Sequence, residues 1–111
     1  MRFEKAANRA LEFRKERGWA QFHNPKDLAI SINLEAAELL EAFQWSGQDL
    51  EAKSKTKKIK EELADVVIYC IYLADTLGLD LPDAVSSKLD ENARKYPAEK
   101  ARGNARKYTE L

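Results

Sequence analysis

The sequence is poor in the residue types that build disulfide frameworks and zinc sites. Its 111 residues include one cysteine and one histidine. Cys70 therefore has no internal disulfide partner, and this pair alone cannot supply the ligands of a zinc site. Because Tyr69, Ile71 and Tyr72 surround Cys70 in the chain, we interpret it as a small core residue in a reducing compartment.

An excess of charge of one sign is also absent. Lys and Arg together number 19, Asp and Glu together number 19, and the formal net charge is +0. The chain therefore lacks the basic surface typical of nucleic-acid-binding proteins, and no global field attracts it to an anionic membrane. We expect no nucleic acid and no membrane among its partners.

Long hydrophobic runs are missing as well. The longest apolar stretch, residues 66–74, is too short to cross a bilayer, and residues 1–5 lack the apolar run of a signal peptide. With 44% hydrophobic and 34% charged residues, the composition is typical of a globular protein. We expect a cytoplasmic protein with a single domain over residues 1–111.

Glycine and proline are scarce, and they fall at the boundaries of helical patterns. The sequence has no convincing strand, so the predicted fold class is all-α. Gly18, Gly78 and Pro97 mark helix ends, and Asn24-Pro25 and Asp80-Leu81-Pro82 mark helix starts. The predicted helices cover residues 3–17, 24–45, 56–77 and 80–96, followed by a polar C-terminal tail over residues 98–111 that docks against a neighbour or stays loose.

The third predicted helix is apolar nearly all round between residues 65 and 74. Such a helix is buried on several sides, and three short partners in one chain give it little cover. We therefore expect a four-helix bundle-like fold assembled as a homo-oligomer.

Two pairs of acidic residues stand out, Glu35 with Glu38 and Glu62 with Asp65. A spacing of three residues places both members of a pair on one helix face. Many solvated helices carry such pairs, so the spacing alone favours an ordinary charged surface.

The helical wheel, at ~100° per residue, argues for a different environment. Each acidic pair lies on a stripe that borders the apolar side of its helix. The second helix carries Ser31, Glu35, Glu38, Ala42 and Trp45 on this stripe, and the third carries Lys58, Glu62, Asp65, Tyr69, Tyr72 and Thr76.

Four carboxylates beside packing seams need a neutralising partner, because buried like charges repel each other. Lys58, one turn before Glu62, is one candidate. A hard divalent cation such as Mg²⁺ is the better one, because it prefers oxygen ligands. A di-iron carboxylate bundle needs Glu-x-x-His pairs, and the single histidine, His23, precedes the second helix.

These features resemble the MazG-like superfamily of all-α nucleotide pyrophosphohydrolases, whose signature is ExxE followed one helix later by ExxD. The chain is most similar to the dCTP pyrophosphatase branch, and the similarity extends over nearly the whole sequence. It rests on residues 18–23, 38–45, 61–69, 80–82, 88–92, 94–97 and 107–111.

The resemblance implies Mg²⁺-dependent hydrolysis of a deoxynucleoside triphosphate, with dCTP favoured, at the α-phosphate to the monophosphate and pyrophosphate, in nucleotide-pool cleaning. Mn²⁺ would be a substitute metal. The metal ligands would be Glu35, Glu38, Glu62 and Asp65. Glu38, narrowly ahead of Glu35, would also orient the attacking water.

The resemblance also implies substrate contacts and an assembly. Around the base and sugar it predicts Trp19, His23, Trp45 and Tyr69, and it adds Asn92 on the nucleotide and Lys88 near the phosphates. On its own, each of these residues would be an ordinary packing or surface residue. The implied assembly is a homodimer or a dimer-of-dimers tetramer.

One departure from the family pattern bears on which nucleobase the site prefers. Ala10 stands where some animal relatives have histidine, which puts cytosine selectivity in doubt. The alternatives are the same fold acting on dATP, dUTP or a modified dCTP, and a non-catalytic helical oligomerisation module.

Overall fold

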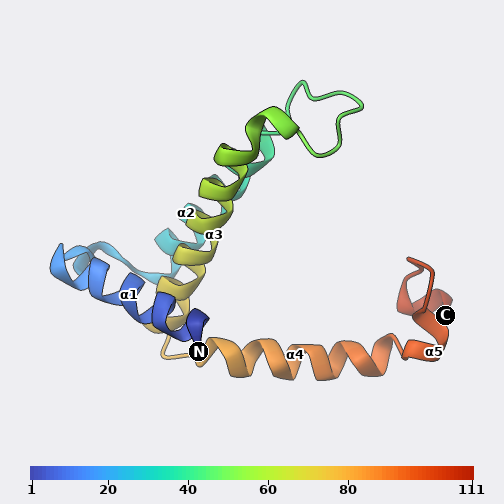
Figure 1. The fold of residues 1–111 in the computed structure, drawn as a ribbon. Coiled ribbons are helices and arrows are strands. Elements are labelled where there is room, and N and C mark those ends of the chain that lie inside the picture. The colour runs from blue at the N-terminus through green and yellow to red at the C-terminus, as the bar shows by residue number, and fades with distance from the viewer. The chain divides into compact units, whose positions relative to one another are not determined.

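The computed structural model describes residues 1–111 as helices joined by turns, with no strand (Figure 1). The predicted all-α class is therefore confirmed. The residues form two compact units, 1–78 and 79–111.

The first unit is built from three helices, α1 (Arg2–Glu16), α2 (Pro25–Glu41) and α3 (Thr56–Thr76). Short 3₁₀ turns, η1 (Trp19–Phe22) and η2 (Lys53–Lys55), precede α2 and α3. Helices α2 and α3 pack side by side as a hairpin, and α1 packs against α3 (Figure 1). The hairpin therefore brings the two acidic pairs onto neighbouring helices.

Local sequence signals explain most helix ends. Gly18 adopts a left-handed φ of 64° after α1, a conformation that glycine adopts without steric cost. The Asn24 side chain accepts a hydrogen bond of 2.9 Å from the Asp27 backbone N–H, and Pro25 is the first residue of α2. These starts and stops match the predicted ones within one or two residues.

The predicted C-terminal end of α2 is wrong. The helix stops at Glu41 rather than at Trp45, and the backbone N–H groups of Phe43 and Gln44 bond three residues back, to Leu40 and Glu41. Such tighter bonds terminate a helix. Trp45 then has a left-handed φ of 68°, so it leaves the stripe on which it was predicted.

The loop between α2 and α3 has its own buried residue. Ala52 is 2% exposed and has a φ of 46°, a left-handed conformation that is unfavourable for any residue with a Cβ atom. Its N–H bonds to the Asp49 carbonyl, and its carbonyl accepts from the Lys55 N–H. The Ala52 side chain is therefore buried in a loop whose backbone hydrogen bonds flank it.

The core of the first unit is small. Its buried apolar side chains are Leu28, Ala42, Ala52, Ile71, Tyr72 and Ala74. Within the single chain α3 is only partly covered, because Ile71, Tyr72 and Ala74 are buried while residues 66–70 are half-buried. Ile30, Leu34 and Leu40 of α2 are exposed, so the hairpin keeps an apolar surface.

The second unit consists of α4 (Leu81–Lys95), a short α5 (Ala98–Ala101) and a 3₁₀ turn η3 (Tyr108–Glu110). The Asp80 carboxylate caps α4 by accepting a bond of 3.0 Å from the Asp83 N–H. The predicted polar tail folds back within its own unit. The ring of Tyr108 lies 5.9 Å from that of Tyr96, and the Lys95 ammonium lies 5.0 Å from the Tyr108 ring centre.

None of the helices combines the length and the apolar character that crossing a lipid bilayer requires.

Candidate metal and nucleotide site

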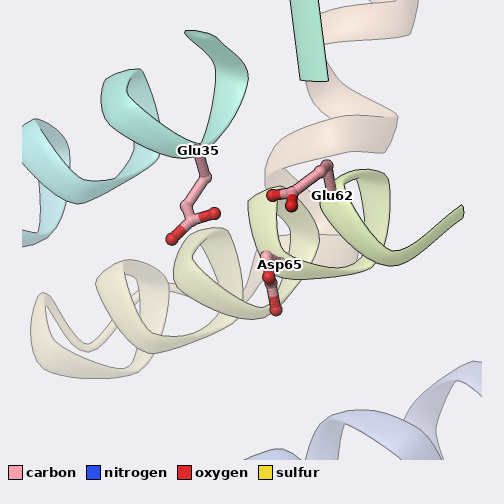
Figure 2. Close-up of side chains that lie close together, drawn as sticks. All are labelled: Glu35, Glu62 and Asp65. Atoms are coloured by element: carbon pink, nitrogen blue, oxygen red, sulfur yellow. The ribbon is translucent and has the colours of Figure 1, made fainter. Parts of the chain in front are cut away.

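The acidic pairs of α2 and α3 face each other across the hairpin. Figure 2 shows Glu35 extending from α2 toward Glu62 and Asp65 on α3. One carboxylate oxygen from each of these three residues lies within 4.8 Å of the others. Two pairs separated by 23 residues of sequence thus meet in one cluster.

Glu38 belongs to the same cluster. Its carboxyl group interacts with those of Glu35 and Glu62 and contributes to the raised pKa of each. Of the four acids predicted as metal ligands, three place carboxylate oxygens near one another, and Glu38 lies beside them. We call Glu35, Glu38, Glu62 and Asp65 the acidic cluster.

The acidic cluster lacks a protein cation. Lysine and arginine form ion pairs with other acids, and none of these pairs involves a member of the cluster. Lys58, which the sequence offered as a partner for Glu62, makes no such pair. The Oε2 atoms of Glu35 and Glu62 are buried without a hydrogen-bond partner.

This environment disfavours the ionised carboxylates. Burial, followed by the hydrogen bond and charge of Glu38, raises the pKa of Glu35 to about 7. The hydrogen bond with Glu38, followed by burial, raises the pKa of Glu62. Crowded acids with raised pKa values are typical of functional sites.

A divalent cation fits this donor set. The cluster offers only carboxylate oxygens, which are the preferred ligands of hard divalent ions. A bound cation would also give the buried Oε2 atoms of Glu35 and Glu62 the partner that the protein does not supply. The residues are therefore suited to hold a divalent metal ion.

An apolar groove begins beside the acidic cluster. It has a volume of about 870 Å³, and α1 and α3 form its walls. Asp65 of the cluster lies in its lining together with Trp19 and Tyr69, and Ala10 contributes a small side chain on the α1 side. A groove with one acidic, metal-suited end and aromatic walls has the character of a small-molecule site.

The two tryptophans differ in their relation to this groove. Trp19 is 43% exposed and packs edge-on against Phe13, with ring centres 5.7 Å apart. Trp45 is 92% exposed and lies outside the groove lining. The structure therefore brings Trp19 to the candidate site but leaves Trp45 apart from it within this chain.

His23 and Tyr69 meet at a common neighbour, Tyr72. The His23 ring lies 5.4 Å from the Tyr72 ring at 31°, and the Tyr69 ring lies 6.0 Å away at 89°. The Nδ1 atom of His23 is buried without a hydrogen-bond partner. Burial, followed by the charge of Arg14, lowers the pKa of His23.

Lys88 and Asn92 belong to α4 in the second unit. The Lys88 ammonium lies 3.4 Å from a Glu91 carboxylate oxygen, which also pairs with Lys95. Asn92 is half-buried. Neither residue is positioned relative to the acidic cluster, so their predicted nucleotide contacts stay predictions.

The sequence patterns did not point to Arg14, which is 6% exposed and whose guanidinium lies over the Tyr72 ring. The available signal was its spacing from Ala7, Ala10 and Leu11, which places Arg14 on the inner face of α1.

The chain is similar in sequence to proteins of a known family. The sequence profile of the MazG-like family matches residues 30–111. The chain is 46% identical over 105 residues to dCTP pyrophosphatase 1 of Homo sapiens and 43% identical to that of Mus musculus. These matches cover 90% of this chain but 62% of each relative, so the chain spans less than two thirds of their length.

A solved structure is also similar to the chain in its fold. The crystal structure of a pyrophosphatase from Archaeoglobus fulgidus DSM 4304 is similar with a TM-score of 0.79 and 42% sequence identity. The match covers 87% of this chain and 94% of that one. The chain belongs to the MazG-like family.

Proposed function

We propose that this chain is a nucleoside triphosphate pyrophosphohydrolase that uses Mg²⁺ to hydrolyse a deoxynucleoside triphosphate, with dCTP favoured. The products are the monophosphate and pyrophosphate, and the role is nucleotide-pool cleaning. The convergence of four acids without a protein cation, at the end of an aromatic groove, carries this proposal. Relatives named dCTP pyrophosphatase 1 support the substrate class.

The acidic cluster would hold the metal. Glu35, Glu38, Glu62 and Asp65 supply the carboxylate oxygens, and Mn²⁺ is a substitute ion with similar preferences. When bound, the cation neutralises the acids and the triphosphate and polarises the phosphoryl group. Without it, the same four carboxylates would repel a polyanionic substrate.

The protein's own residues would provide the general base and would position the nucleotide. Glu38, narrowly ahead of Glu35, accepts a proton from the attacking water. The water oxygen bonds to the α-phosphorus, and the bond from that phosphorus to the bridging oxygen breaks, releasing pyrophosphate. Trp19 and Tyr69, with their aromatic faces in the groove, hold the base and sugar, since every base offers a face for stacking.

Self-assembly belongs to the same proposal. A homodimer or a dimer-of-dimers tetramer would cover the exposed apolar side chains of α2 and complete the bundle around α3. Trp45, which is nearly fully exposed in one chain, would then be available to a neighbouring subunit's nucleotide.

Hydrolysis of a panel of nucleotides tests the proposal directly. The purified protein is incubated with each of the four common dNTPs, dUTP and a modified dCTP, in Mg²⁺, Mn²⁺ or EDTA, and the products are separated by chromatography. Monophosphate and pyrophosphate in equal amounts, formed only with metal, are expected. Orthophosphate as the first product would refute cleavage at the α-phosphate.

The same panel addresses the alternatives. Ala10 in the groove lining removes one polar contact to the base, so dATP, dUTP or modified dCTP are the competing substrates. Fastest turnover of one of them would replace dCTP in the proposal. No turnover of any nucleotide would favour the non-catalytic helical oligomerisation module.

A further inference from the structure

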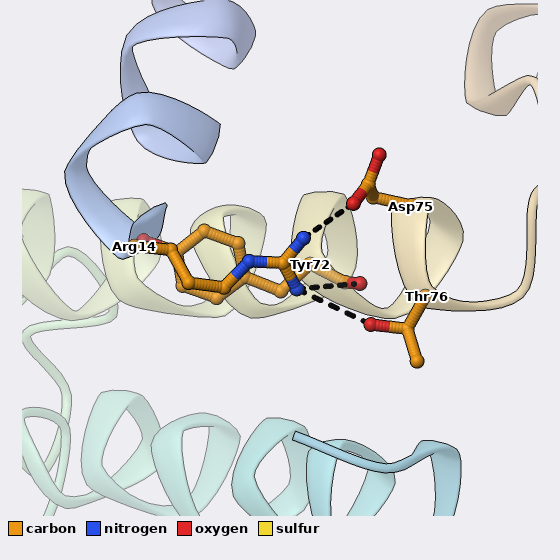
Figure 3. A network of polar contacts seen from close by, with 4 residues as sticks. All are labelled: Arg14, Tyr72, Asp75 and Thr76. Carbon is orange, nitrogen blue, oxygen red and sulfur yellow. Dashed lines mark hydrogen bonds and ion pairs between the residues drawn. The ribbon is translucent and has the colours of Figure 1, made fainter. Parts of the chain in front are cut away.

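A buried network connects α1 to the C-terminal end of α3. The guanidinium of Arg14 donates to the Thr76 hydroxyl at 3.2 Å and to the Tyr72 carbonyl at 3.5 Å, and it forms an ion pair with Asp75. Figure 3 shows these bonds converging on the one guanidinium. A buried arginine at a helix C-terminus is stabilised by such carbonyl and carboxylate acceptors.

The same guanidinium lies over the Tyr72 ring, 4.9 Å from its centre. Planar guanidinium groups stack on aromatic faces in a way that ammonium groups do not. Tyr72 is 4% exposed, so this contact is shielded from water and is stronger than an exposed one. Arg14 thus packs directly against the Tyr72 ring.

Tyr72 in turn contacts two predicted nucleotide-binding residues. His23 packs on its ring, and Tyr69 meets it edge to face. Because His23 Nδ1 has no hydrogen-bond partner, no bond at that atom orients the imidazole, whose ring contacts that of Tyr72. Tyr69 and Tyr72 both line the groove that reaches Asp65.

We propose that Arg14 is a positioning residue, which holds Tyr72 and through it orients His23 and Tyr69 for nucleotide binding. This inference rests on the proposed function, because it assigns Arg14 to the nucleotide-binding end of the same site. Arg14 itself touches no reacting atom. Its loss should therefore weaken substrate binding while the acidic cluster keeps its chemistry.

Two variants remove the two halves of the contact. Arg14→Met keeps a long apolar side chain but loses the guanidinium, and Tyr72→Leu loses the ring that His23 packs against. Lys15→Met is the matched control, because it makes the same kind of change one residue away, at a side chain that is exposed and lies outside the Arg14 network. Arg14→Lys separates charge from stacking, since lysine can pair with Asp75 but cannot stack as a plane.

The single histidine gives a readout that does not depend on activity. Proton NMR of the full-length protein follows the His23 ring signals against pH. In Arg14→Met the pKa of His23 should rise, because the nearby positive charge that lowers it is gone. In Tyr72→Leu the ring signals should shift, because a neighbouring aromatic ring is lost.

Steady-state kinetics on the preferred nucleotide complete the test. Arg14→Met and Tyr72→Leu should raise KM on the order of tenfold with kcat changed less. Arg14→Lys should have a similar effect to Arg14→Met, and Lys15→Met should resemble the unmodified protein. Circular dichroism melts identify a variant that fails to fold. If either Arg14→Met or Tyr72→Leu does so, the kinetics of the other variant test the inference. Unmoved His23 signals, or moved signals with unchanged KM, would overturn the inference.

Failure of the proposed function gives a different pattern. If the unmodified protein hydrolysed no nucleotide, binding of dNTPs would be measured by calorimetry for the same variants. Equal affinities for the unmodified protein and Arg14→Met would overturn the positioning role, and a weaker affinity in Arg14→Met would support it without catalysis.

Discussion

At the scale of single residues, neighbouring glutamates of α3 have opposite surroundings. Glu61 is exposed and pairs with Lys57 at 3.9 Å, as an ordinary surface acid does. Glu62 is half-buried, contacts Glu38 and has an oxygen without a partner. One position of sequence therefore separates a solvated charge from a member of the acidic cluster.

This pair provides a matched test of the metal site. Glu62→Gln should reduce turnover by at least roughly 100-fold, because it removes a metal ligand, while Glu61→Gln should keep near-normal turnover. Metal-free Glu62→Gln should also melt at a temperature equal to or higher than the unmodified protein, since one repelling charge is gone. Initial rates in Mg²⁺ and thermal melts in EDTA measure both effects. Near-normal activity of Glu62→Gln would contradict the assignment.

The raised pKa of Glu35 predicts a pH-dependent stability of the metal-free protein. Its pKa of about 7 in the folded chain exceeds the ordinary value of 4.5. Folding therefore favours the protonated form, and this contribution is fully present below pH 4.5 and is lost as the pH rises through about 7. Glu35→Gln should lose this dependence. Urea unfolding of both proteins in EDTA at pH 5.5 and 8.0 measures the difference.

The comparison between the two proteins separates the acidic cluster from the titrating groups elsewhere in the chain. The unmodified protein should lose stability relative to Glu35→Gln between the two pH values, and Mg²⁺ should restore it at pH 8.0. A constant difference at both pH values would contradict the raised pKa.

At the scale of helices, local signals predicted boundaries where they act through a few neighbouring residues. Asn24 with Pro25, and Asp80 with Pro82, marked helix starts because their caps are formed within three residues. The C-terminal end of α2 lacked such a signal, since Phe43 and Gln44 are compatible with helix. The helix ends earlier because the N–H groups of Phe43 and Gln44 bond three residues back instead of four.

The cap of α2 gives a quantitative prediction. Asn24→Ala removes the acceptor of the Asp27 N–H and should lower the free energy of unfolding by about 1 kcal/mol. Asn33→Ala, in the exposed interior of the same helix, should leave stability unchanged or slightly higher. Urea denaturation of both variants measures this. An equal effect of the two substitutions would show that the cap contributes nothing.

The candidate site was predictable where it follows helix periodicity. Glu35, Glu38, Glu62 and Asp65 converge because each pair borders an apolar stripe, and packing two such stripes together brings the acids into contact. The Arg14 network was not predictable in this way, because its partners Tyr72 and Asp75 are about 60 residues away. Positions of Lys88 and Asn92 relative to the cluster depend on contacts beyond helix patterning.

At the scale of the whole molecule, the first unit leaves apolar side chains of its central hairpin in contact with solvent. Ile30, Leu34 and Leu40 on α2 are half or more exposed, and the middle of α3 is only half-buried. Apolar faces of this kind mark protein interfaces. The proposed homo-oligomer would remove them from water.

Substitution of adjacent residues tests this assembly. Leu34→Glu places a charge in the apolar face and should shift the protein toward monomers, because an unpaired charge is costly to bury. Asn33→Glu adds the same charge one residue earlier and should leave the assembly intact. Size-exclusion chromatography with light scattering gives both masses. A monomeric unmodified protein would refute the homo-oligomer.

The loop at Ala52 has a consequence for the variation that this chain can tolerate. Its left-handed backbone favours glycine, and its 2% exposure leaves no room for a longer side chain. In a library that samples all amino acids, only alanine and glycine should persist at position 52 after selection for folding. Position 50, where Leu50 is 83% exposed, should accept nearly any residue, so two positions of one loop would diverge at very different rates.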